Sequence, residues 1–137
     1  MRPLAEIEAE IGSIAGTGEA AAESLLALAE QVLEHWIAAR GEDPTGEQVE
    51  GFRLLALHRQ GARGVPSFNA CRETCREIAY HYNLLRLEPD AGRDEGRQRM
   101  MAMLTMHLVL FVSGKMQIEG LGEFCCASRP LRLEKNH

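Results

Sequence analysis

Apolar residues recur at a strict helical spacing along residues 68–85, and this periodicity constrains the fold more than any other feature of the chain. Successive members of the pattern are three or four residues apart, so they share one face of a helix that packs against neighbours. That face consists of Phe68, Cys71, Cys75, Ile78, Tyr82 and Leu85. Because free cysteine is among the most buried residue types, both cysteines are predicted to face the core as small apolar side chains.

Three further segments carry a helical pattern, and glycines or prolines separate them. Aromatic residues make up only 5% of the chain, so the core must be built mainly from aliphatic side chains, which favours helices over sheets. Thr45 opens a capping-box sequence and Ser67 is a natural N-cap, so each is expected to start a helix. The predicted helices cover about 18–40, 46–60, 67–87 and 93–115.

These segments predict an all-α fold, an antiparallel bundle of about four main helices with a short N-terminal helix and an irregular C-terminal tail. At 137 residues the chain fits one helical domain, 1–137, in which about 1–17 and 119–137 are peripheral segments.

The charge and hydropathy patterns argue against a nucleic-acid or membrane partner. The formal net charge is -5, whereas a nucleic-acid binder usually carries a basic excess or a basic stripe. The longest apolar stretch, residues 100–112, is shorter than the roughly 20 residues that span a bilayer, and residues 1–30 show no secretory pattern. We therefore expect a cytoplasmic protein with no nucleic-acid and no membrane partner, whose thiols stay reduced.

The cysteines allow two readings besides core packing. Thiols four residues apart on a helix are close enough to share a metal, and Cys125 and Cys126 would complete a four-cysteine zinc or iron–sulfur site with Cys71 and Cys75, although the spacing matches no standard metal motif. The other reading is a thiol-redox role, because Cys71 lies in the first turn of its helix, where the helix dipole stabilises a thiolate.

Sequence motifs of known enzyme classes are absent, so we assign no catalytic residue and expect no enzymatic activity. The one catalytic constellation worth testing is a cysteine–histidine pair, Cys75 with His58 or His107, which would have to meet across the bundle.

The loop between the second and third predicted helices carries an anion-binding signal. Arg63 and Arg72 flank Ser67, which would cap a helix whose free amides point into the loop, and Arg59 lies one turn upstream. These residues predict a pocket for a phosphate or carboxylate group at Arg63, Ser67 and Arg72. The alternative is an ordinary capped helix whose arginines pair with the acidic first half of the chain.

The helix predicted at 93–115 is apolar on nearly every side and, with its flanks, holds five of the six methionines. Such a helix is either enclosed by others or divided between the core and an interface, and methionine suits adaptable contact surfaces. We therefore expect this helix to mediate homo-oligomer formation or the binding of a partner protein. The leading functional hypothesis is an accessory or regulatory protein that acts through protein–protein contacts.

Overall fold

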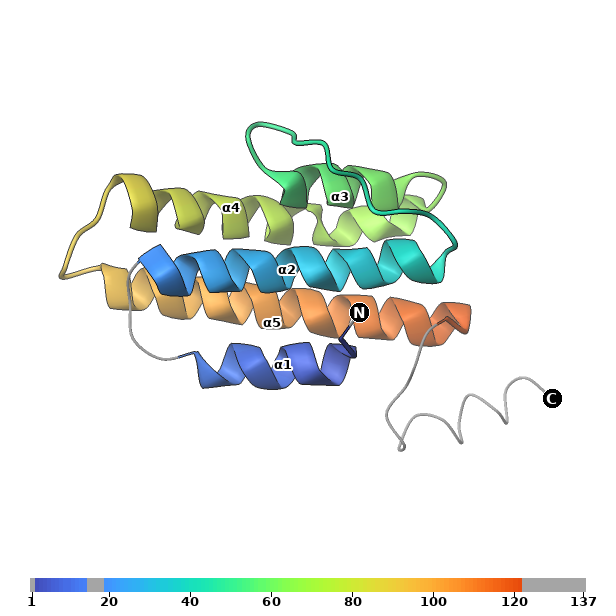
Figure 1. The fold of residues 1–137 in the computed structure, drawn as a ribbon, viewed down its shortest axis with the longest axis horizontal. Helices are drawn as coiled ribbons and strands as arrows, with labels where there is room; N and C mark the ends of the chain where they lie inside the picture. The colour runs from blue at the N-terminus through green and yellow to red at the C-terminus, as the bar shows by residue number, and fades with distance from the viewer. Residues whose placement is uncertain (1, 15–18, 122–137) are drawn as a thin grey trace.

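The computed structural model describes residues 2–14 and 19–121, and this part of the chain is helical with no β-strand (Figure 1). The all-α prediction is therefore confirmed. Most of the expected irregular tail, from residue 122 onward, lies outside the described residues. The helices are α1 (Leu4–Ser13), α2 (Glu19–Ala39), α3 (Arg53–Ala62), the 3₁₀ helix η1 (Pro66–Cys71), α4 (Arg72–Leu87) and α5 (Asp94–Glu119).

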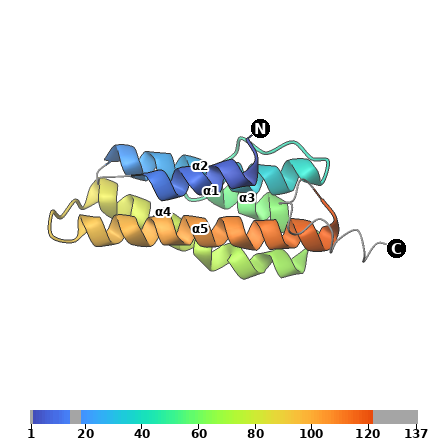
Figure 2. The same cartoon turned by 90° about the horizontal axis from the view of Figure 1, so that it is seen from below.

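Helices α2 and α5 form the centre of the arrangement, because α2 packs against α1, α3, α4 and α5, and α5 packs against α1, α2 and α4. The three longest helices, α2, α4 and α5, lie side by side along the long axis, and α4 runs in the opposite direction to the other two (Figure 1). Helix α1 covers the α2–α5 side, as the view from below also shows (Figure 2). Helix α3 packs on α2, α4 and η1.

The face predicted along residues 68–85 is buried throughout, which confirms the periodicity as a core-packing signal. Its six members are at most 7% exposed, and the two cysteines are 2% and 0% exposed. They contact an aliphatic core to which every helix contributes; α1, for example, contributes Ile7 and Ile11.

One aromatic stack joins the helices at the α3 end of the core. The rings of Trp36 on α2 and Phe68 on η1 are parallel to within 9°, with centroids 4.8 Å apart. Phe68 also contacts the rings of His58 on α3 and Phe111 on α5, each at a centroid distance of 5.6 Å. The Trp36 indole donates a hydrogen bond of 2.9 Å to the carbonyl of Gly61, which fixes α3 against α2.

The capping-box prediction at Thr45 was wrong, because α3 begins at Arg53 and residues 42–52 are not helical. The Thr45 hydroxyl accepts a bond from the Glu47 amide, two residues on, which is a turn and not a helix cap. Tertiary contacts hold this segment extended. Gln60 accepts a bond from the Thr45 amide and donates to the Asp43 carbonyl, while Arg53 donates to the Thr45 carbonyl.

The N-cap prediction for Ser67 was also wrong. The chain enters α4 through η1, which has Pro66 at its first position, Val65 as its N-cap and no side-chain cap bond. The Ser67 hydroxyl accepts a hydrogen bond of 2.7 Å from Lys115 on α5 instead. The predicted end of this helix at about residue 87 is confirmed, since α4 ends at Leu87.

Helix α5 divides its surface between the core and the outside. Its inner face, which includes Met101, Leu108 and Val112, is buried, while Met103, Leu110 and Ile118 on the opposite side are 55% to 74% exposed. In the part of the chain that the structure describes, α5 alone is long and apolar enough to cross a membrane by length and composition. The core helix of a water-soluble protein meets the same criterion, so this is weak evidence for a membrane span.

The Trp36–Phe68 stack makes the Gly61 position a test of the fold. A Cβ at Gly61 would lie 2.9 Å from the Trp36 ring and 3.0 Å from the Phe68 ring. These two rings stack on each other, so neither can easily move aside. We expect Gly61→Ala to lower the free energy of unfolding by about 1–3 kcal/mol through overpacking. Gly114→Ala in α5 is the matched control, because a Cβ there meets no atom within 4 Å, and it should be neutral or stabilising. Urea unfolding followed by circular dichroism measures both, and equal stabilities of the two variants would contradict this packing.

Candidate functional site

An arginine-lined pocket lies where α3, η1, the first turns of α4 and the turn before α3 meet. Its volume is about 360 Å³. Arg59 and Arg63 reach it from the end of α3, and Arg72 and Arg76, one turn apart, reach it from α4. The remaining lining comes from Val49, Glu50, Leu55, His58, Ala62 and Asn69.

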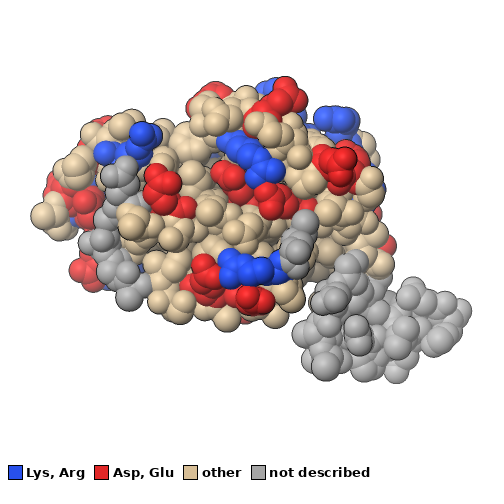
Figure 3. All heavy atoms as spheres, viewed as in Figure 1, with Lys and Arg blue, Asp and Glu red and all other residues tan. Residues whose placement is uncertain are grey.

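The lining of this pocket is strongly basic in a chain whose net charge is -5. Four arginines and one acidic residue, Glu50, line it. Within the described residues Arg59 and Arg63 have no ion-pair partner, and Arg72 contacts only its exposed neighbour Glu73, at 3.3 Å. The face seen in Figure 3, by contrast, shows acidic and basic side chains interspersed.

Glu50 is the built-in counter-charge of the pocket. Its two carboxylate oxygens accept bonds of 3.1 and 3.2 Å from the two terminal nitrogens of Arg76, a bidentate pair. The hydrogen bond from Arg76 lowers the pKa of this carboxyl, and the charges of Arg76, Arg72 and Arg59 add to the effect. A carboxylate is therefore already favoured at the point where an anionic ligand would bind.

The turn that carries Glu50 has an unfavourable backbone. Glu50 and Gly51 both have positive φ, 53° and 85°, and the flanking Val49 and Phe52 exchange two backbone hydrogen bonds. This is a two-residue hairpin turn, in which glycine or asparagine is the usual choice for such a conformation. A glutamate there is sterically disfavoured, and residues held in this way cluster at ligand sites and switches.

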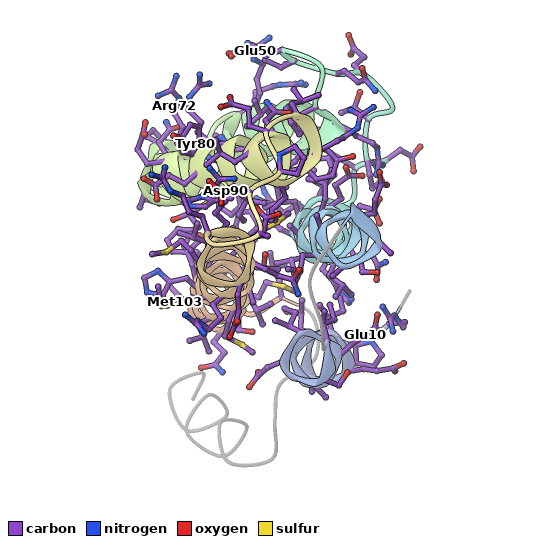
Figure 4. All side chains as sticks on the ribbon, turned by 90° about the vertical axis from the view of Figure 1, so that its left-hand side faces the viewer. Glu10, Glu50, Arg72, Tyr80, Asp90 and Met103 are labelled. Atoms are coloured by element: carbon purple, nitrogen blue, oxygen red, sulfur yellow. The ribbon has the colours of Figure 1, made fainter. Side chains whose placement is uncertain are left out.

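A second pocket of about 380 Å³ adjoins the first, since Glu50, Leu55 and Arg76 line both. Its other residues include Tyr80, which is 59% exposed, Phe52 and Asn83. Glu50, Arg72 and Tyr80 lie on the same side of the molecule in the end-on view of Figure 4. The arginine pocket therefore opens along the outer surface of α4 toward an aromatic ring.

A buried cluster of two thiols and an imidazole lies behind the arginine pocket. His58, which lines the pocket, and Cys71 both contact the Phe68 carbonyl, His58 through Nε2 at 3.2 Å and Cys71 through Sγ at 3.3 Å. Cys75, one turn further along α4, and His58 both lie close enough to influence the pKa of the Cys71 thiol. The predicted cysteine–histidine pair thus has Cys71 and not Cys75 beside His58.

The two thiols have divergent acidities because they share one hydrogen bond. The bond from Cys75 is the main reason that the pKa of Cys71 falls from 9.0 to about 6, and His58 lowers it further against the opposing effect of burial. The same bond and burial raise the pKa of Cys75 well above its ordinary value. The thiolate form is therefore more favoured at Cys71 than at Cys75.

The metal-site prediction finds no support in the described residues. Cys71 and Cys75 adjoin each other, but no group of three histidine, cysteine or acidic side chains in residues 2–14 and 19–121 is placed to hold a metal ion. Cys125 and Cys126 lie outside these ranges. The zinc or iron–sulfur hypothesis stays a prediction.

The structure brings together two of the three residues predicted for anion binding. Arg63 and Arg72 line the arginine pocket, whereas Ser67 is engaged by Lys115 and does not line it. Sequence reasoning missed Glu50 and Asn69 as lining residues, and it did not include Arg76 in the predicted site. The four-residue spacing of Arg72 and Arg76 was an available signal, since it places both on one helix face. Nothing local in the sequence marked Glu50.

Comparisons of the chain with protein-family models, with curated proteins and with solved structures found no match in any of the three. The chemistry of the site must therefore be inferred from its own geometry.

The acidity of Cys71 can be measured directly in a chain carrying Cys125→Ser and Cys126→Ser. We expect thiolate absorbance near 240 nm to develop for one group at a pKa of about 6. Cys75→Ala and His58→Gln should each raise this value because each removes a hydrogen bond to the thiolate. The pKa of Cys71 is lower in the folded protein than in the unfolded chain, so ionised Cys71 stabilises the fold at high pH. This contribution to the free energy of unfolding should be lost as the pH falls through about 6. Titration of both thiols only near 9.0 would contradict this assignment.

Proposed function

We propose that this protein binds a small anionic molecule, a carboxylate or phosphate compound, in the arginine pocket. The observation that supports this is that four arginines and a single acidic residue line one pocket. Guanidinium groups present planar donor pairs that match carboxylate and phosphate oxygens. Placing four of them together costs repulsion, and a bound anion relieves it.

The uneven pairing of the arginines supports the same conclusion. Arg76 is satisfied by Glu50, while Arg59 and Arg63 have no ion-pair partner in the described part of the chain. A ligand anion would bind beside Arg59, Arg63 and Arg72, and Asn69 would add an amide group at the rim. Arg76 would join only when Glu50 turns away. In this proposal Glu50 competes with the ligand and sets its affinity.

Binding of inorganic phosphate and of succinate, measured by titration calorimetry at fixed ionic strength, tests the anion site. We expect Arg72→Gln to weaken binding at least tenfold, about the effect of losing one charge-assisted hydrogen-bond partner. Glu50→Gln should tighten it, because the competing carboxylate is gone. Arg99→Gln is the matched control, since Arg99 is an exposed arginine paired with Glu95 on α5 and lines neither pocket. Equal losses in the Arg72 and Arg99 variants, or no saturable binding by the unaltered chain, would overturn the proposal.

A second candidate function is a protein contact through the outer face of α5, as the sequence predicted for residues 93–115. Exposed positions recur along this face: Met100, Met103, His107, Leu110 and Ile118. This stripe lies opposite the buried side of α5, and its large apolar members are 38% to 74% exposed. Figure 4 shows Met103 on the outer side of α5. Exposed apolar stripes of this kind are typical of association surfaces, and we propose that a second copy of the chain covers this one.

Sedimentation equilibrium over a range of concentrations tests this contact. We expect a dimer that Leu110→Glu converts to a monomer, since it places a charge in the centre of the apolar stripe. Leu87→Glu is the control, because Leu87 is also exposed, at 65%, but lies at the end of α4. A monomer at every concentration would remove this candidate. The cytoplasmic location and the accessory or regulatory role remain predictions with either function.

A further inference from the structure

The arginine pocket and the pocket that adjoins it form the two halves of one elongated site. Glu50, Leu55 and Arg76 line both halves, whose volumes are about 360 and 380 Å³. Arg72 lines the first and Tyr80 the second, and these positions are separated by about 12 Å along the axis of α4. A phosphate or carboxylate ion beside Arg72 therefore leaves the second pocket open to the rest of the same ligand.

The second pocket is largely apolar and contains an accessible aromatic ring. Its apolar lining comes from Phe52, Leu55, Ala79 and Tyr80. In the part of the chain that the structure describes, Tyr80 is the one aromatic side chain that is exposed, at 59%. Its ring makes a T-shaped contact with the ring of His81, with centroids 5.4 Å apart. An exposed ring in a pocket is a surface on which a planar group of a ligand can stack.

The two pockets also differ in charge. Arg76 and Glu50 form their bidentate pair at the boundary and offset each other there. Beyond this pair, the arginine pocket retains three further arginines, whereas the remaining polar lining of the second pocket consists of Glu77 and Asn83. An anionic group is therefore favoured in the first pocket and disfavoured in the second. The second pocket suits an uncharged ring whose polar atoms can pair with an amide.

We propose that the ligand of this site is a nucleoside monophosphate. This inference rests on the proposed anion-binding function and names its class of ligand. The phosphate binds in the arginine pocket, to the arginines outside the Glu50–Arg76 pair. The base stacks on Tyr80, where Asn83 offers both a donor and an acceptor to the edge of the base. The ribose spans the boundary between the two pockets.

The separation of the two pockets selects this ligand architecture. A ring joined directly to its anionic group, as in phenyl phosphate, is shorter than the separation between Arg72 and Tyr80. In a nucleoside monophosphate the sugar and its 5′ carbon stand between the phosphate and the ring. Every base has a flat face that can stack on an aromatic side chain. We therefore expect the site to accept all the common bases with little preference among them.

Titration calorimetry at fixed ionic strength tests the class of ligand with four probes: adenosine monophosphate, ribose 5-phosphate, phenyl phosphate and inorganic phosphate. We expect adenosine monophosphate to bind roughly tenfold more tightly than ribose 5-phosphate, which is the gain from stacking one base. Phenyl phosphate should bind no more tightly than ribose 5-phosphate, because its ring does not reach the second pocket. Equal affinities for adenosine monophosphate and ribose 5-phosphate, or for adenosine monophosphate and phenyl phosphate, would overturn the inference.

Variants of Tyr80 assign the gain to its ring, with circular dichroism to confirm folding. Tyr80→Ala should reduce the affinity for adenosine monophosphate to that for ribose 5-phosphate and leave phosphate binding unchanged. Tyr80→Phe keeps the ring and should keep the affinity. Leu87→Ala is the matched control, because Leu87 is exposed, at 65%, and lines neither pocket. Equal affinities of the Tyr80→Ala and Leu87→Ala variants for adenosine monophosphate would contradict the stacking role.

The nucleotide assignment and the proposed anion site fail in different ways. If inorganic phosphate binds in a manner that depends on Arg72 but the base adds no affinity, the anion site stands and the nucleotide assignment is wrong. If none of the four probes binds, both are wrong.

Discussion

The stacking of Trp36 on Phe68 is the contact on which the site depends. It joins α2 to η1 at 4.8 Å, and the Phe68 ring extends it to His58 on α3 and Phe111 on α5. Aromatic pairs add about 0.5–1.5 kcal/mol beyond the area that they bury, so the cluster stabilises the end of the bundle where α3 is short. The absence of a side chain at Gly61 lets Trp36 and Phe68 come together.

The same residue connects packing with chemistry. The ring of Phe68 belongs to the core, while its carbonyl lies within hydrogen-bond distance of both His58 and Cys71. The stack therefore fixes the position of the dithiol relative to the imidazole. It also fixes α3 against the start of α4, which brings Arg59 and Arg63 opposite Arg72 and Arg76. The basic pocket and the thiol cluster both lie where α3, η1 and α4 meet.

The sequence predicted well where local spacing decides the structure. The burial of Phe68 through Leu85 and the end of α4 followed from helical periodicity, which depends only on neighbouring residues. The prediction from sequence was wrong where side chains distant in the sequence form hydrogen bonds with the segment. Gln60 and Arg53 hold the backbone around Thr45 extended, and Lys115 takes the hydroxyl of Ser67. Each of these contacts competes with a local cap, and a cap contributes only about 1 kcal/mol.

The sequence alone therefore determined the helical class, the buried face that carries Cys71 and Cys75, and an excess of arginine around the loop before α4. The tertiary structure decided which groups meet. It placed His58 beside Cys71, aligned four arginines on one pocket and brought Glu50 to Arg76 across 26 residues of chain. The physical reason is that periodicity fixes which side of a helix is buried, whereas the crossing and contacts between helices fix which polar side chains face one another.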